Sequence, residues 1–179
     1  PHGRGFSLLA TSVMPGLIPD MAEGVDPCWS ADIFLTMPVP EIRPATKGDL
    51  PTITEIYEHA VCYGTATFEL IPPDLAEMTR RFRALSDGGF PYFVATVEGH
   101  VIGYAYAGPY RPRPAYRFTV ENSVYLKPST HRRGIGLQLM QRLIPECEAR
   151  GYRQMIAVIG DSAVVAALAS ARASVGPGR

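Results

Sequence analysis

The sequence of 179 residues has no excess of charge of either sign, because 17 lysine and arginine residues balance 17 aspartate and glutamate residues. A protein that binds nucleic acid usually carries a basic excess, so we expect no nucleic-acid partner. No apolar stretch approaches the ~18 residues of a membrane-spanning helix, and we expect no contact with a membrane. The charge balance thus argues against a nucleic-acid partner, and the lack of a long apolar run argues against a membrane-spanning segment.

Cysteine and histidine are scarce and scattered. The three cysteines, Cys28, Cys62 and Cys147, form no CxxC pair, and their odd count argues against a disulfide framework. We interpret them as thiols of a reducing compartment and expect a cytoplasmic protein. The four histidines lie at positions 2, 59, 100 and 131 without metal-ligand spacing, so we expect no metal.

Apolar residues make up 46% of the sequence and charged residues 19%, which is ordinary for a globular protein with a buried core. Six of the 17 prolines fall in the first 40 residues, where no helical or alternating pattern lasts ten residues. We therefore expect residues 1–37 to be a leader outside the fold, and residues 38–161 to form one domain.

The patterns after residue 40 predict a strand, two helices, three strands, a helix and a final strand. Apolar residues at helical spacing indicate helices over 50–60, 75–85 and 140–147; other apolar runs indicate strands around 42 and over 91–97, 101–107, 116–126 and 154–159. Asp74 and Glu77 have the spacing of a capping box. Pro145 falls inside the last helix, where it should kink the helix or cost ~3 kcal/mol. This order is typical of a mixed α/β sheet.

The segment His131-Arg132-Arg133-Gly134-Ile135-Gly136 joins a strand to the last helix. Its two glycines let the backbone pass close to a ligand, and the N–H groups of the first helical turn favour an anion. The dinucleotide fingerprint is incomplete, because Leu139 stands where a third glycine belongs. This hexapeptide by itself is compatible with a phosphate site or with a tight turn that carries two arginines.

The same loop resembles the acetyl-CoA signature of the GNAT acyltransferases, which reads Gln or Arg, x, x, Gly, x, Gly or Ala. Both glycines match, and His131 departs at the first position. The segments Thr65-Ala66-Thr67-Phe68-Glu69, Ala105–Tyr125 and Ala157-Val158-Ile159-Gly160-Asp161 are similar to the phosphinothricin and methionine sulfoximine N-acetyltransferases within that family. The similarity covers residues 38–161.

This resemblance implies an α/β fold of the GNAT type, with a mixed, mostly antiparallel sheet flanked by helices. It also implies transfer of an acetyl group from acetyl-CoA to the primary amine of a small amino-acid-like substrate, of the phosphinothricin, methionine sulfoximine or methionine sulfone type. The alternative is a catalytically impaired CoA-binding remnant of the family.

The resemblance also implies which residues form the site. Glu121 matches the family's proposed base, with a structural carboxylate or a ligand of the substrate ammonium as alternatives. The implied contacts to acetyl-CoA are Val124, Tyr125, Leu126, His131, Arg132, Arg133, Gly134, Ile135, Gly136 and Leu137. The implied contacts to the amine substrate are Phe68, Glu69, Arg111 and Arg113, of which the two arginines suit a carboxylate.

The sequence shows no recognisable similarity to the family after Asp161, and we interpret residues 162–179 as an atypical tail. The C-terminal part of the GNAT fold is then truncated or replaced, which argues against the homodimer that the family forms. The strand over 154–159 would become an exposed apolar edge, with Met155, Ile156, Val158 and Ile159 unshielded. We therefore expect poor solubility and little activity.

Overall fold

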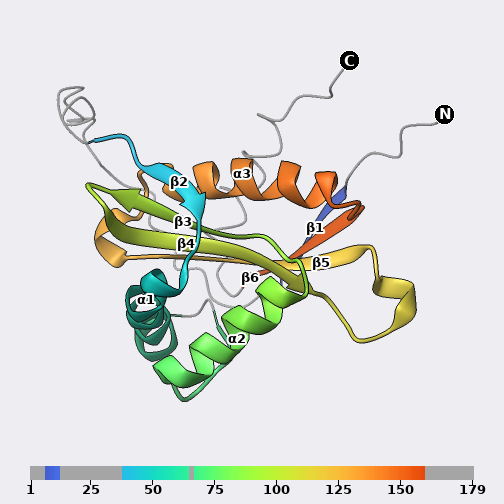
Figure 1. Cartoon of the computed structure of the whole chain (residues 1–179), viewed down its shortest axis with the longest axis horizontal. Coiled ribbons are helices and arrows are strands. Elements are labelled where there is room, and N and C mark those ends of the chain that lie inside the picture. The colour runs from blue at the N-terminus through green and yellow to red at the C-terminus, as the bar shows by residue number, and fades with distance from the viewer. Residues whose placement is uncertain (1–6, 13–37, 65–66, 160–179) are drawn as a thin grey trace, which may run out of the picture.

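A computed structural model of the chain describes residues 7–12, 38–64 and 67–159. They form one sheet of six strands in the order β1-β6-β5-β4-β3-β2, with helices on both faces (Figure 1). The elements are β1 (Ser7–Ser12), β2 (Glu41–Pro44), α1 (Leu50–Tyr63), α2 (Leu75–Asp87), β3 (Tyr92–Val97), β4 (His100–Pro109), β5 (Thr119–Leu126), α3 (Ile135–Ala149) and β6 (Gln154–Ile159).

The sheet combines antiparallel and parallel pairing. Strands β2 to β5 form an antiparallel series, whereas β6 pairs in parallel with β5 on one side and with β1 on the other. The predicted mixed, mostly antiparallel sheet with flanking helices is confirmed, and so is the predicted order of elements from β2 to β6. Within residues 7–12, 38–64 and 67–159, no helix has the length and apolar character needed to cross a membrane.

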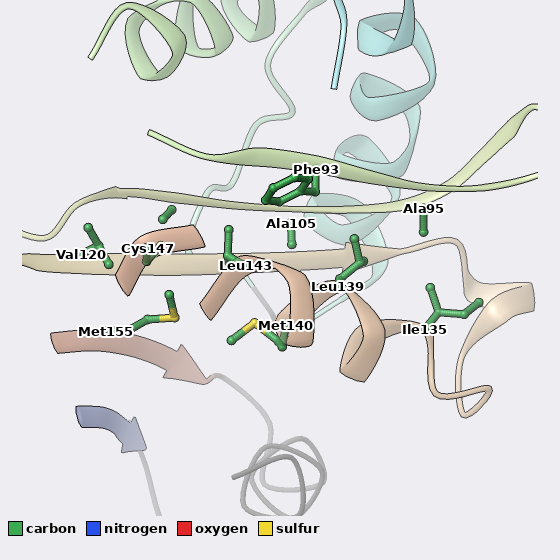
Figure 2. Packing of buried hydrophobic residues seen from close by; sticks show 11 residues of the cluster. Phe93, Ala95, Ala105, Val120, Ile135, Leu139, Met140, Leu143, Cys147 and Met155 are labelled. Carbon is green, nitrogen blue, oxygen red and sulfur yellow. The ribbon is translucent and has the colours of Figure 1, made fainter. Parts of the chain in front are cut away.

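The two faces of the sheet carry separate apolar layers. Helix α3 covers one face, where Leu139 and Leu143 pack with Phe93, Val120 and Met155 of the strands (Figure 2). Helices α1 and α2 cover the other face (Figure 1), and their packing partners there include several tyrosines of β3, β4 and β5. Since strand side chains alternate between faces, β3, β4 and β5 contribute to both layers.

Both helices on the second face begin at an aspartate. The Asp74 carboxylate accepts a hydrogen bond from the Glu77 N–H at 2.8 Å, which confirms the predicted cap of α2. The Asp49 carboxylate, which precedes α1, accepts two hydrogen bonds from the Arg43 guanidinium at 2.7 and 2.8 Å. It also accepts the Thr46 N–H at 2.7 Å. The start of α1 is thus tied to the end of β2 by a charged, half-buried contact.

Helix α3 does not end at Pro145. It continues to Ala149, with Leu143 and Cys147 fully buried on either side of the proline. Burial of such side chains contributes about 1.5–3 kcal/mol each for a residue as large as leucine. The free energy gained from this packing is of the same order as the expected cost of an internal proline, so tertiary contacts keep the helix intact.

The expectation that residues 1–37 lie outside the fold is wrong for Ser7–Ser12. These residues form β1, which pairs in parallel with β6 over its whole length, from Ser7↔Gln154 to Ser12↔Ile159. An apolar strand at the edge of a sheet leaves a row of unpaired backbone groups, and a neighbouring strand satisfies them. Six residues without alternating polarity are too short to reveal such a strand in the sequence.

The expectation of an unshielded β6 is wrong for the same reason. Met155, Ile156 and Ile159 are buried, and Val158 is half-buried. The tail that we place at 162–179 lies outside the described residues, as do residues 1–6 and 13–37 of the leader.

Candidate active site

Strands β5 and β6 separate midway along β5. Their parallel pairing begins at Thr119↔Gln154 and ends at Asn122↔Ala157, although β5 continues to Leu126. Beyond Asn122, no described strand pairs with β5 on that side. The second half of β5 therefore borders an opening at its β6 side.

Backbone alternation decides which groups of β5 face this opening. The Lys127 N–H donates to the Ile102 carbonyl at 2.9 Å, one position beyond the Gly103↔Leu126 pair of the β4/β5 register. In antiparallel strands, successive residues direct their N–H and C=O groups to opposite sides. The backbone N–H and C=O groups of the odd-numbered residues of β5 therefore bond to β4. The N–H and C=O groups of Val124 and Leu126 point toward the opening. Consistently, the Leu126 carbonyl lies 3.3 Å from His131 Nε2.

The loop after β5 turns sharply into α3. Arg132 and Gly134 have positive φ angles of 60° and 75°, and positive φ is rare for a residue with a side chain. Gly134 is the N-cap of α3 and provides no capping side chain. The first backbone bond of the helix runs from the Gln138 N–H to the Gly134 carbonyl at 3.1 Å, so the N–H groups of Ile135, Gly136 and Leu137 have no partner within the helix.

Gly136 connects this helix start to the open half of β5. A Cβ atom at Gly136 would lie 3.7 Å from Leu126 Cδ1 and 3.9 Å from Val124 Cγ1. The N–H groups at the start of α3 therefore lie close to the backbone groups of Val124 and Leu126 that face the opening, of which the Leu126 carbonyl contacts His131. Such N–H groups at the positive end of a helix suit a pyrophosphate, and the open strand suits a chain of amides. The residues present thus fit a CoA-type ligand.

Glu121 lies on the opposite face of β5 from Val120, which packs against α3. The side chain is half-buried, and burial raises the pKa of its carboxyl above the ordinary value of 4.5. Within the described residues, this carboxylate accepts no hydrogen bond and forms no ion pair. A partly desolvated carboxylate without a partner is a good proton acceptor.

A layer of tyrosines adjoins Glu121. Tyr104, Tyr106 and Tyr92 stack with ring centroids 5.0 to 6.3 Å apart, and Tyr125 lies 5.3 Å from Tyr104. Burial raises the pKa of Tyr106, whose hydroxyl is hydrogen-bonded to Ser123 and lies within electrostatic range of Glu121. The face around Glu121 is thus aromatic, with few groups that could compete for a proton.

The expected substrate residues Phe68 and Glu69 lie on the same side of the sheet. The Phe68 ring is 69% exposed and is therefore no part of the core. The Glu69 carboxylate is bound by Arg81 at 2.7 and 3.2 Å and accepts the Tyr57 hydroxyl at 2.8 Å. Tyr57 in turn packs its ring edge to face with Tyr125 at 5.0 Å, which places this segment over β5.

Arg111 and Arg113 lie on the exposed loop between β4 and β5. A cavity of about 300 Å³ is lined by both arginines together with Arg117, Tyr116 and Thr119. None of these three arginines pairs with a carboxylate in the described part of the chain. The lining also includes Phe90 and Tyr152, which pack against the α3 layer, so the cavity lies at the start of β5, two residues before Glu121.

The sequence reasoning missed several residues of this region. Arg81, Tyr57, Tyr106 and Ser123 contact or adjoin the expected site residues, but their spacing along the chain shows no motif. Asn122 was also missed, although it follows Glu121 directly within the segment Ala105–Tyr125 that resembles the family. It is buried where β5 and β6 part, and its Oδ1 has no hydrogen-bond partner among the described residues.

The structure thus brings most of the implied cofactor residues together around the start of α3, whereas Tyr125 packs against Tyr57 on the opposite face of β5. Of the implied substrate residues, Phe68 and Glu69 belong to that opposite face, and Arg111 and Arg113 lie on the loop that leads into β5. Glu121 and Val124 lie three residues apart on the strand that joins the two regions. Arg133 has further contacts in the structure. The exposed residues of the loop, His131, Arg132 and Gly134, border the unpaired helix start.

Comparison with known proteins shows similarity to GNAT acetyltransferases in both sequence and structure. The family model "Acetyltransferase (GNAT) family" matches residues 53–172, which extends past Asp161, where we expected the resemblance to end. The phosphinothricin N-acetyltransferase of Alcaligenes faecalis is 50% identical over 127 residues, which cover 71% of this chain and 64% of that protein. The methionine sulfoximine/methionine sulfone acetyltransferase of Pseudomonas paraeruginosa is 42% identical over 119 residues, covering 66% and 69%.

Among solved structures, the phosphinothricin acetyltransferase of Sinorhizobium meliloti in complex with AcCoA has a TM-score of 0.70 and 46% identity, with 76% of this chain and 74% of that chain covered. The acetyltransferase yncA of Salmonella typhimurium with acetyl-CoA has a TM-score of 0.71 and 35% identity, covering 78% and 79%. The chain spans 64% and 65% of the length of two curated phosphinothricin N-acetyltransferases that it matches. By sequence and by fold, the chain belongs to the GNAT acetyltransferase family.

Proposed function

We propose that this protein transfers an acetyl group from acetyl-CoA to the primary amine of a small amino-acid-like substrate, of the phosphinothricin, methionine sulfoximine or methionine sulfone type. The observation that carries the proposal is the position of the Glu121 carboxylate, which has no partner in the described part of the chain, three residues before the open backbone of Val124 on the same strand. A proton acceptor and an unpaired N–H donor are the two groups that such a transfer requires.

Acetyl-CoA supplies an activated acetyl group as a thioester. The N–H groups of Ile135, Gly136 and Leu137 bind its pyrophosphate, with His131, Arg132, Arg133 and Gly134 bordering them. The open groups of Val124 and Leu126 bond the amides of its pantetheine arm, and Tyr125 holds the strand between them. These contacts fix the thioester in the gap between β5 and β6.

Glu121 prepares the amine for attack. An α-amino group has a pKa near 8, so most of it is protonated at neutral pH and cannot attack. Glu121 accepts this proton, directly or through water, and the neutral nitrogen attacks the thioester carbon. The new N–C bond forms as the C–S bond breaks, the sulfur leaves with the bonding electrons, and it takes up the proton that the nitrogen loses on becoming an amide. The Val124 N–H stabilises the negative charge that develops on the carbonyl oxygen.

The amino-acid substrate is recognised by its carboxylate. Arg111 and Arg113 carry forked guanidinium groups that suit a carboxylate, and the cavity that they line includes Thr119, two residues before Glu121 on β5. The exposed Phe68 ring offers an apolar surface to the side chain of the substrate. Recognition of both ends of the amino acid aligns its nitrogen with Glu121.

Release of the CoA thiol from acetyl-CoA in the presence of a panel of amines tests the proposal. Phosphinothricin, methionine sulfoximine and methionine sulfone should release thiol and yield N-acetyl products detectable by mass spectrometry, whereas their N-methylated or carboxyl-free analogues should react far more slowly. If the protein binds acetyl-CoA but releases no thiol with any amine, it is a CoA-binding remnant of the family and the proposal is wrong.

A further inference from the structure

Arg81, which lies in the middle of α2, binds the segment that precedes this helix. Its guanidinium donates to both oxygens of Glu69 and, through Nε, to Glu77 at 2.7 Å. Glu77 lies one helical turn before Arg81, so an ion pair within α2 fixes the position of the guanidinium. Hydrogen bonds from Arg81 lower the pKa of the Glu69 carboxyl, which therefore remains charged and bound near neutral pH.

Tyr57 supplies a second anchor from α1. Its hydroxyl donates to Glu69 and lies 3.0 Å from the Thr67 hydroxyl, which in turn accepts the Glu69 N–H at 3.2 Å. The side chains on both sides of Phe68 are therefore fixed, although the Phe68 ring itself is exposed. A segment without regular secondary structure is thus held by polar contacts from two helices.

This anchored segment belongs to the face of the sheet that carries Glu121. The Tyr106 hydroxyl lies within electrostatic range of Arg81, Glu69 and Glu121. Tyr57 packs against Tyr125 of the same strand as Glu121. Thr67 to Glu69 therefore lie beside the tyrosine layer, on the same face of the sheet as Glu121.

We propose that Arg81 is a positioning residue for the amine substrate: by binding Glu69, it fixes the Thr67–Glu69 segment as a wall of the amine site. This inference rests on the proposed amine acetylation. It assigns Glu69 a different role from a direct substrate contact, because three donors from Arg81 and Tyr57 already occupy its carboxylate. An ammonium group would meet the positive charge of Arg81 beside the single acceptor position that these donors leave.

The two roles predict opposite effects of Arg81→Met. If Arg81 positions the wall, loss of the guanidinium loosens the segment and raises KM for the amine. If Glu69 binds the substrate ammonium directly, loss of its competitor leaves the carboxylate available and lowers that KM. In either case acetyl-CoA, which is held at the other face of β5, should bind as before.

The experiment compares Arg81→Met, Glu69→Gln and the double variant with the wild type. We expect each single variant to raise KM for the amine by about fivefold or more and to leave KM for acetyl-CoA within about twofold. The double variant should resemble either single variant, because residues that act through one contact are not additive. Arg80→Met is the matched control, since Arg80 bonds Glu77 but not Glu69, and it should change neither constant.

Hydrogen exchange provides a readout that does not depend on turnover. The Glu69 N–H, which bonds to Thr67, should exchange faster in Arg81→Met than in the wild type and in Arg80→Met. An unchanged or lower KM for the amine in Arg81→Met, additive effects in the double variant, or unchanged exchange at Glu69 would each overturn the proposal. If the wild type acetylates no amine, the proposed function fails, and the exchange result by itself decides whether Arg81 fixes the segment.

Discussion

Asn122 of β5 and Ala157 of β6 are the last pair at which these two parallel strands meet. On one side of this pair lies Glu121, within the paired region, and on the other side lies Val124, whose N–H has no strand partner among the described residues. The proton acceptor and the candidate thioester-binding group are thus separated by the point where the sheet opens. This relationship makes the roles of Glu121 and Val124 separately testable.

Glu121→Gln should lower turnover by roughly 10²–10⁴ while the affinity for acetyl-CoA changes little, because the amide cannot accept the proton from the ammonium group. Steady-state kinetics and calorimetry measure the two quantities. The melting temperature should not fall, since the variant replaces a half-buried charge that has no partner. A variant with a near-normal rate would assign Glu121 a structural role.

The same carboxylate should produce an acidic limb in the pH–rate profile. Burial raises the Glu121 pKa, so kcat/KM should rise with pH through a midpoint above 4.5, the ordinary value for glutamate. Deprotonation creates the active form of the base, and for this reason activity is lost as the pH falls. The limb should be absent from Glu121→Gln, and its persistence there would point to another titrating group.

Gly136→Val should raise the dissociation constant of acetyl-CoA at least tenfold, or about 1.4 kcal/mol, because added methyl groups block the approach of the pyrophosphate. An added Cβ meets only ordinary contacts at 3.7 and 3.9 Å, so the fold should tolerate the change. Gly136→Ala should show a smaller effect. Calorimetry measures the affinity, and circular dichroism verifies the fold. Unchanged affinity in a folded variant would exclude the helix start as the pyrophosphate site.

Removal of residues 1–12 should lower the melting temperature by more than about 5 °C, whereas removal of residues 1–6 should have little effect. Only the longer deletion removes β1 and exposes the backbone edge of β6. For a protein of this size, 1 kcal/mol corresponds to roughly 2–4 °C. Differential scanning fluorimetry and light scattering compare the two chains. Equal stability of the two would mean that β6 does not need β1.

Asp49 should make stability depend on pH in the acid range. Hydrogen bonds from Arg43 lower the Asp49 pKa from 3.8 to about 2, so its contribution is fully present above pH 4 and is lost as the pH falls to 2. A shift of this size corresponds to about 2 kcal/mol. Asp49→Asn should therefore lower the free energy of unfolding at pH 7 by about that amount. Between pH 4 and 2, the variant should lose less of its free energy of unfolding than the wild type. The exposed Glu58→Gln serves as control in urea unfolding at both pH values.

Local patterns in the sequence determined much of this protein. The spacing of apolar residues predicted α1, α2 and α3, and Asp74 marked the start of α2 correctly, because capping and amphipathicity depend on neighbours within one or two helical turns. The loop with Gly134 and Gly136, together with the other segments that resemble the family, indicated a GNAT protein, and the positive φ of Gly134 is a local reason for glycine at that position.

Contacts between distant residues were decided only by the tertiary structure. Nothing in Ser7–Ser12 shows that it pairs with Gln154–Ile159, because strand pairing depends on backbone groups that every sequence shares. The opening after Asn122 likewise depends on where β6 lies. Arg81 occupies the Glu69 carboxylate from twelve residues away. A charge that looks available for substrate in the sequence is therefore already neutralised in the fold, because an ion pair forms wherever packing brings its partners together.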